Sequence, residues 1–213
     1  PAAVQARIGF ILLNSDEVGE GAFQLLMPSN EVAVYTTRTG YSHGGGGFTT
    51  PTSFRDIADT LPPADRFDVL AFSCTSATVA LGIPALLEKL QTAKPGVKYT
   101  SPGIAMIEAL KHVNAQRVAL LTPYGLEFHQ KFLPFLREGG INVAADGVFD
   151  CKTDVEICEL HVGAILEAAK LLVERSAADV LFLSCTSMPV VPHLARFEAE
   201  LGIPVISSTQ AMA

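Results

Sequence analysis

A seven-residue pattern that occurs twice constrains the fold of this chain more than any other feature. Residues 70–76 read LAFSCTS and residues 181–187 read LFLSCTS. In each copy an apolar run, typical of a buried strand, ends in Ser-Cys-Thr-Ser, and a helix-like segment follows. Serine and threonine are favoured at helix N-caps. We therefore expect Cys74 and Cys185 each to lie where a strand passes into a helix, at the carboxyl edge of a sheet, where open α/β folds bind ligands.

The similarity between the two parts extends beyond the cysteines. Residues 7–13 match residues 117–122, and residues 100–106 match residues 207–212, with a nearly constant separation. We interpret the chain as two related halves of one ancestral unit. Packing around an approximate twofold axis would bring both cysteines to the seam between the halves.

These matches predict a division into residues 1–114, which carry Cys74, and residues 115–213, which carry Cys185. The first half continues after Met106 into an amphipathic segment, which we expect to form a helix that covers its own sheet. The second half stops one residue after Met212, so a closing helix is missing from it on this interpretation.

Strand and helix signals alternate through both halves. This order predicts an α/β fold made of two pseudo-symmetric parallel-sheet halves with helices on both faces. Four consecutive glycines at 44–47 predict a loop, either a tolerated surface loop or a lid over a pocket. The expected strands are 7–13, 31–37, 67–72, 97–100, 117–122, 141–148, 179–183 and 203–206, and the expected helices are 18–27, 51–60, 84–90, 103–112, 126–137, 157–174 and 190–200.

Composition excludes several classes of protein. The 213 residues suffice for a sizeable core, and 49% hydrophobic against 17% charged residues is ordinary for a globular chain. A net charge of −7 without a basic cluster argues against nucleic-acid binding. No apolar run approaches the roughly 20 residues that span a bilayer, and the first residues lack a signal-peptide core. We therefore expect no membrane association and a cytoplasmic location.

Four cysteines in such a chain are expected to be free thiols. Cys151 and Cys158 have no counterpart in the first half and match no zinc spacing, so we expect them to be structural or incidental and expect no metal site. Cys74 and Cys185 are different, because a helix N-terminus lowers a thiol pKa and offers N–H groups to an anion. Hydroxyl donors follow both cysteines, and together these groups suit a small carboxylate ligand: Thr75, Ser76, Thr186 and Ser187.

Two thiols on opposite sides of one carbon can act without a cofactor. One thiolate can remove a proton while the other thiol returns one from the far side, which inverts a stereocentre. Alternatively, one sulfur can add to an activated C=C bond while the other acts as an acid, which permits cis–trans isomerisation. The residues alone leave both routes open.

The twin Ser-Cys-Thr-Ser segments in a duplicated chain resemble the aspartate/glutamate racemase superfamily. The branch that they resemble holds maleate cis–trans isomerases, arylmalonate decarboxylases and the ectoine utilisation protein A group. Residues 8–12 are similar to the family's opening strand, residues 121–124 to its Thr-Pro-Tyr motif, and residues 207–211 to its closing Ser-Ser-x-x-Ala segment. The resemblance implies that Tyr124 contacts the substrate carboxylate and that Cys74 is the acid/base or nucleophile, with Cys185 as its partner.

Two departures bear on the activity. Asp16 stands where maleate isomerases carry a substrate-binding asparagine, and an aspartate repels a dicarboxylate; this favours the ectoine utilisation branch. Asp16 could equally cap the helix that follows it. Arylmalonate decarboxylases have glycine in place of the first cysteine, so Cys74 argues against decarboxylation.

The expected function is therefore a cofactor-independent isomerase or racemase of a small carboxylate or amino-acid derivative. A malonate-type decarboxylase and a non-catalytic sensor of small acids are the alternatives. A homodimer or higher homo-oligomer is expected, since folds of this size and symmetry are commonly dimeric.

Overall fold

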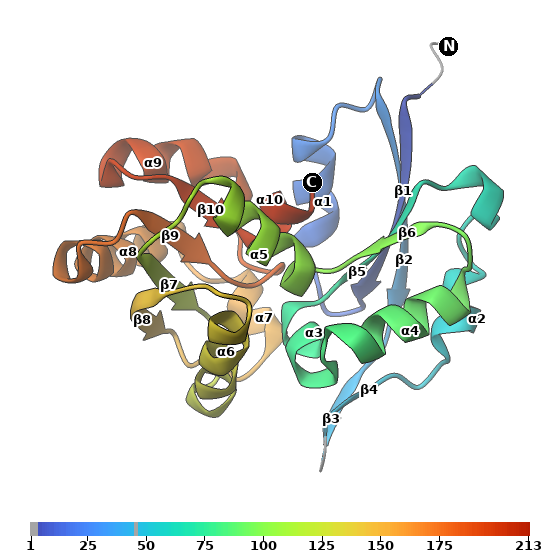
Figure 1. Ribbon diagram of the computed structural model, residues 1–213, viewed down its shortest axis with the longest axis horizontal. Helices are drawn as coiled ribbons and strands as arrows, with labels where there is room; N and C mark the ends of the chain where they lie inside the picture. Colours follow the sequence, from blue (N-terminus) through green and yellow to red (C-terminus); the bar gives the residue numbers. More distant parts are fainter. Residues whose placement is uncertain (1–3, 45–46) are drawn as a thin grey trace.

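Two four-stranded parallel sheets form the framework of the structure (Figure 1). The computed structural model describes residues 4–44 and 47–213, without the side chains of residues 42–44 and 47. The first sheet has the order β2 (Val32–Thr39), β1 (Ala6–Leu13), β5 (Val69–Ser73) and β6 (Lys98–Thr100). The second has the order β10 (Val205–Ser207), β9 (Val180–Leu183), β7 (Val118–Thr122) and β8 (Val143–Val148).

Strand order is the same in both sheets when the second is followed from β8 to β10. β1 corresponds to β7 and β5 to β9, as the sequence matches require. Every strand pair within these two sheets is parallel. The prediction of an α/β fold with two similar parallel sheets is therefore confirmed.

Helices surround the sheets, and their bounds follow chain order. In the first half they are α1 (Gly19–Leu26), α2 (Phe54–Ala58), α3 (Thr75–Leu81), α4 (Ile83–Ala93) and α5 (Pro102–His112). In the second half they are α6 (Leu126–Glu138), α7 (Asp154–Cys158), α8 (Val162–Ser176), α9 (Leu194–Leu201) and α10 (Ser208–Met212). Short 3₁₀ helices occur at Ala64–Arg66 and Val191–His193.

Side chains of the central strands alternate between two cores, as the period of two in a strand requires. In β1, Ile11 packs with the residues of α2 and α4, whereas Phe10 and Leu12 pack with those of α1. In β7, Leu121 packs with α8 and Leu120 packs with α6. Each sheet is therefore buried on both faces, which explains why its strands read as continuous apolar runs.

The sequence predicted that helix α5 covers only the sheet of its own half. In the structure it packs against both sheets. Ala105 packs with the first sheet, but Met106 and Leu110 pack with strands of the second sheet. In return, Met212 of α10 packs against Phe10. Figure 1 shows α5 and α10 lying between the two sheets. The two halves thus share a core along the seam, because each sheet also packs against a helix from the other half.

One predicted helix is two. The segment 157–174 divides into α7, which ends at Cys158, and α8, which begins at Val162. The His161 side chain accepts a hydrogen bond from the Gly163 N–H and caps α8, so the chain turns between the two helices.

The four-glycine segment lies partly outside the described residues, because these exclude Gly45 and Gly46. On either side of them, β3 (Ser42–Gly44) and β4 (Gly47–Thr49) pair antiparallel. The prediction of an irregular loop therefore misses a short hairpin. Among the described residues, none of the helices combines the length and the hydropathy that a bilayer crossing requires.

Candidate active site

Cys74 and Cys185 line one cavity of about 520 Å³ at the carboxyl ends of β5 and β9. Cys74 follows β5 directly and is the N-cap of α3, where its Sγ accepts a hydrogen bond from the Ala77 N–H at 3.4 Å. Its Sγ also lies 3.4 Å from the Ser76 hydroxyl. The fold thus brings together two cysteines that the sequence places in different halves.

Cys185 does not lie at a helix N-terminus, contrary to the sequence expectation. A turn follows it, then the 3₁₀ helix Val191–His193, and α9 begins only at Leu194. Proline at 189 and 192 explains the delay, because a proline disfavours helical conformation in the residue before it. The Sγ of Cys185 instead accepts a hydrogen bond from the Ser187 N–H at 3.4 Å.

Burial reverses the expected shift of both thiol pKa values. It raises the pKa of Cys74 to about 11, although the Ser76 hydroxyl and the Ala77 N–H oppose the shift. Burial also raises the pKa of Cys185 well above its ordinary value, against the opposing Ser187 N–H. Loss of water around each sulfur outweighs the nearby donors, so both are thiols at neutral pH.

The threonines that follow the cysteines hold the seam. The Thr75 hydroxyl donates to the Ser208 hydroxyl at 3.3 Å, across the two halves. The Thr186 hydroxyl donates to the Ser73 carbonyl at 3.4 Å, in the opposite direction. Both threonines line the cavity, but these bonds direct their hydroxyl protons at the protein. Ser76 and Ser187, which also line the cavity, are the hydroxyls that remain for a ligand.

Tyr124 also lines the cavity, as the resemblance implied. Its hydroxyl is buried near Cys185 and Thr75 but makes no hydrogen bond of good geometry with the described residues. The Ser73 hydroxyl, from the other half, is also buried without a partner among them. Burial raises the pKa of Tyr124 well above its ordinary value, so it is a neutral donor. Two buried, unpaired hydroxyls in one cavity are costly unless a ligand pairs with them.

Asp16 is outside the lining of the cavity. Its side chain instead binds N–H groups at the start of the following helix, which is the alternative role that the sequence analysis gave it. Its Oδ1 accepts hydrogen bonds from the N–H groups of Val18 at 3.0 Å and Gly19 at 2.8 Å, where α1 begins. Its Oδ2 is buried without a partner among the described residues. Burial raises the pKa of this carboxyl, opposed by the two N–H groups.

Several lining residues were not singled out by the sequence analysis, among them Ser73, Tyr41 and Asp154. Tyr41 and Ser15, both from the first half, donate to the same Oδ2 of Asp154 in the second half. Tyr41 follows β2 and Asp154 follows β8, which are matching strands. Extending the repeat to these two strands would have identified both residues.

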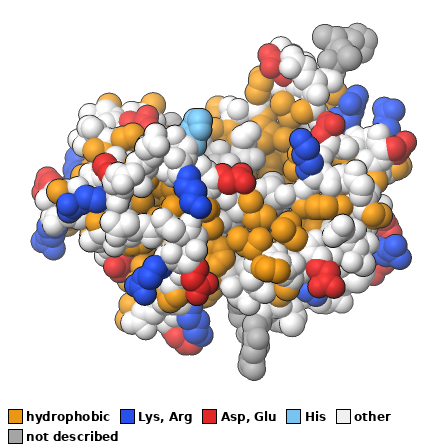
Figure 2. Space-filling view, in the orientation of Figure 1, with side chains coloured by type: hydrophobic (Ala, Val, Ile, Leu, Met, Phe, Trp, Pro, Cys, Tyr) orange, Lys and Arg blue, Asp and Glu red, His pale blue; other side chains and the backbone are white. Residues whose placement is uncertain are grey.

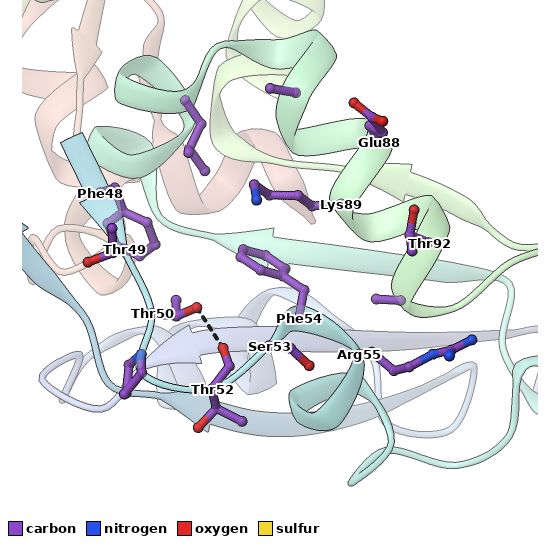
Figure 3. A pocket seen from close by; sticks show the side chains of 14 residues that line it. Phe48, Thr49, Thr50, Thr52, Ser53, Phe54, Arg55, Glu88, Lys89 and Thr92 are labelled. Atoms are coloured by element: carbon purple, nitrogen blue, oxygen red, sulfur yellow. Dashed lines mark hydrogen bonds between the residues drawn. The ribbon is translucent and has the colours of Figure 1, made fainter. Parts of the chain in front are cut away.

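A larger cavity, of about 720 Å³, lies between α2, β4 and α4 (Figure 3). Among the described residues, its lining includes Phe48, Phe54 and Lys89 but no cysteine or histidine. It therefore lacks the thiol pair and lies apart from the site.

Comparison with known proteins agrees with this fold. A maleate isomerase of Nocardia farcinica is 28% identical over 223 residues, which cover 96% of this chain and 86% of the relative. A maleate isomerase of Geobacillus stearothermophilus is 26% identical over 151 residues, which cover 67% of this chain and 60% of the relative.

Solved structures give the same result. The Nocardia farcinica maleate cis–trans isomerase, in a cysteine-to-serine variant with a covalently bound succinylcysteine intermediate, superposes with a TM-score of 0.79 at 24% identity, covering 97% of this chain and 89% of that one. Unliganded arylmalonate decarboxylase superposes with a TM-score of 0.76 at 20% identity, covering 97% and 88%.

The duplicated parallel sheets and the cysteine at each inner edge define an Asp/Glu racemase-like protein. The sequence profile described as arylmalonate decarboxylase matches residues 84–213, more than half of the chain. This chain belongs to the arylmalonate decarboxylase family.

Proposed function

We propose that this protein is a cofactor-independent isomerase of a small unsaturated carboxylate, in which Cys74 and Cys185 act as a pair. The observation that carries the proposal is that both thiols line one cavity at the seam of the two halves. The Nocardia and Geobacillus relatives, both named maleate isomerase, support cis–trans isomerisation as the reaction.

Cys74 is the nucleophile in this proposal. The Ala77 N–H and the Ser76 hydroxyl lie against its sulfur and stabilise a thiolate. The thiolate adds to the alkene carbon β to the carboxylate, and the electron pair of the C=C bond moves to the α carbon and its carboxylate. Cys185 then gives its thiol proton to the α carbon. The succinylcysteine in the Nocardia structure supports an adduct of this kind.

Rotation about the new single bond changes the geometry of the bound acid. The Cys185 thiolate then takes a proton back from the α carbon, the double bond re-forms, and Cys74 leaves as a thiolate. Protons and electrons balance over the cycle, so the two residues return to their starting states without a cofactor.

Neutral donors hold the substrate carboxylate in this proposal. The hydroxyls of Tyr124 and Ser73, one from each half of the chain, line the cavity, and so do Ser76 and Ser187, which follow the two cysteines. In a site shielded from water, such donors stabilise the charge that develops on the carboxylate during addition.

The test is proton NMR of maleate and other short cis-2-enoic acids in deuterated water, which reports both alkene geometry and exchange at carbon. We expect turnover by the wild type and its loss in both Cys74→Ser and Cys185→Ser. Mass spectrometry of Cys185→Ser should show an adduct on Cys74, because this variant keeps the nucleophile, takes the proton for the α carbon from solvent, and lacks the thiolate that removes it again. Full activity in either single variant would contradict the two-thiol proposal.

A second candidate is decarboxylation of a malonate-type acid. The arylmalonate decarboxylase profile favours it, because the matched residues 84–213 include Cys185 but not Cys74. In that case Cys74→Ser keeps its activity and Cys185→Ser loses it. A sensor of small acids would bind them without turnover in all variants.

We also propose that residues 1–114 and 115–213 are the two ancestral units, supported by their common strand order. The cytoplasm is the proposed location, since all four cysteines are free thiols, as a reducing compartment requires.

A homo-oligomer is proposed as well. Figure 2 shows hydrophobic side chains gathered in the middle of one face, over the region where α3, α4 and α5 lie in Figure 1. Apolar residues clustered on a surface mark interaction sites. Light scattering after gel filtration should give the mass of a dimer or larger assembly, and a monomer would contradict this proposal.

A further inference from the structure

The charges around the cavity do not suit a dicarboxylate. The two lysines that line it are Lys131 and Lys152, and both side chains are 66% exposed. Each is already paired with a carboxylate, Lys131 with Glu127 at 2.7 Å and Lys152 with Asp150 at 2.6 Å. The cations among the described lining residues therefore lie at the mouth of the cavity and are neutralised there.

A carboxylate is built into the wall instead. Asp154 lines the cavity, and both hydrogen bonds from Tyr41 and Ser15 go to its Oδ2. Its Oδ1 accepts no hydrogen bond from the described residues and is left for a ligand. Because Tyr41 and Ser15 belong to the other half, the carboxylate is fixed across the seam and does not move away from a bound anion.

A second acidic side chain lies near Asp154. Asp16 is buried, neighbours Ser15 in the chain, and interacts electrostatically with Asp154 and with both active-site thiols. The walls at Tyr124 and Ser73, by contrast, offer unpaired neutral hydroxyls. The cavity lining thus combines neutral donors that suit a carboxylate with a fixed carboxylate of its own that repels one and suits a cation.

We propose that the substrate carries one carboxylate and one cationic nitrogen, the nitrogen lying against Asp154. This inference rests on the proposed function, because it takes the two-thiol cavity as the substrate site. The carboxylate end pairs with the hydroxyls of Tyr124 and Ser73 and activates the double bond for Cys74. The ammonium group replaces the second carboxylate of a substrate such as maleate.

Three cis acids of similar size vary only the charge of the second group: maleate, its monoamide, and cis-4-aminobut-2-enoate. Calorimetry of the wild type should show binding that tightens along this series, with at least about a tenfold advantage for the amino acid over maleate. Asp154→Asn should reduce that ratio at least about tenfold, because the amide still accepts from Tyr41 and Ser15 but carries no charge.

Glu159→Gln is the matched control. Glu159 is exposed at the end of α7, five residues after Asp154 in the same segment and outside the cavity lining, so this variant should keep the wild-type ratio. Maleate binding as tight as that of the amino acid, absence of binding by both, or an unchanged ratio in Asp154→Asn would each overturn the inference.

Turnover separates this outcome from failure of the proposed function. Absence of isomerisation of all three acids, together with the expected order of binding, would contradict the isomerase proposal and leave the charge preference standing. If maleate is bound most tightly and turned over fastest, the isomerase proposal stands and the charge preference is contradicted.

Discussion

Ionisation of Cys74 should limit its reactivity throughout the physiological range of pH. Burial raises the pKa of this thiol from an ordinary 9.0 to about 11. Only the thiolate is a nucleophile, so reactivity follows the small fraction of ionised sulfur. We therefore expect alkylation of Cys74 by iodoacetamide to rise steadily with pH up to about pH 10, without a plateau near neutrality.

The size of this effect follows from the two pKa values. At pH 8 a thiol with a pKa of about 11 is ionised to about one part in 1,000, against about one part in 10 at a pKa of 9.0. Ionisation alone should make Cys74 roughly 100-fold less reactive than an ordinary thiol, and each pH unit should raise the rate roughly tenfold.

The assay follows carboxamidomethylation of the peptide containing Cys74 by mass spectrometry between pH 6 and 10. Ser76→Ala provides a directed change, because the Ser76 hydroxyl lowers the pKa of Cys74 and its loss should slow alkylation at pH 8. A rate that levels off at pH 7 to 8 would refute the reasoning, since it would mean that the helix N-terminus outweighs burial.

Four further variants test the packing and electrostatics. The wild type should lose about 2 kcal/mol more stability than Cys74→Ser between pH 9 and 11, measured by urea unfolding, because unfolding releases a proton that the folded thiol retains; equal losses would be inconsistent with a buried thiol. Gly103→Ala should lower the free energy of unfolding by about 1–3 kcal/mol, since its Cβ would lie 2.5 Å from Thr78 Cγ2. Gly21→Ala is the control, because open space surrounds this position and the substitution should not destabilise α1. Met106→Ala, fully buried between the halves, should cost about 2–5 kcal/mol in the same assay; a cost below 1 kcal/mol would argue against a shared core.

Local sequence predicted the framework because two signals agreed. The apolar runs before Cys74 and Cys185 mark central strands of the two sheets, and the matching segments around them predicted two similar parallel-sheet halves, which the equal strand orders agree with. Because the same Ser-Cys-Thr-Ser segment follows corresponding strands in the two halves, both cysteines were predicted to lie at the seam between them. This placement depends on topology, which a duplicated pattern specifies without any knowledge of side-chain contacts.

For features that depend on long-range packing, the sequence-based predictions were wrong or no prediction was made. The thiol pKa values move upward because the two halves enclose the sulfurs, and burial of this kind is not visible in the residues next to Cys74. The pairing of Tyr41 with Asp154 joins residues from different halves. The prediction that a helix begins directly after Cys185 was also wrong, although the prolines at 189 and 192 indicate a turn there.

The two cysteines occupy equivalent places in the two halves but have different surroundings, and this asymmetry bears on their roles. Cys74 caps α3 and has an N–H and a hydroxyl within 3.4 Å of its sulfur, whereas Cys185 lies in a turn, with the Ser187 N–H at 3.4 Å and the Tyr124 hydroxyl nearby, and burial raises its pKa further. A thiolate is therefore better stabilised at Cys74, and Cys185 is better suited to retain and donate its proton.

It follows that alkylation of the wild type should modify Cys74 before Cys185 at every pH. Cys185→Ser should leave the pH dependence of Cys74 labelling nearly unchanged, while Cys74→Ser should leave Cys185 almost unreactive at pH 8. Faster labelling of Cys185 would reverse the assignment of nucleophile and acid while leaving the shared cavity intact, because both sulfurs would still line it.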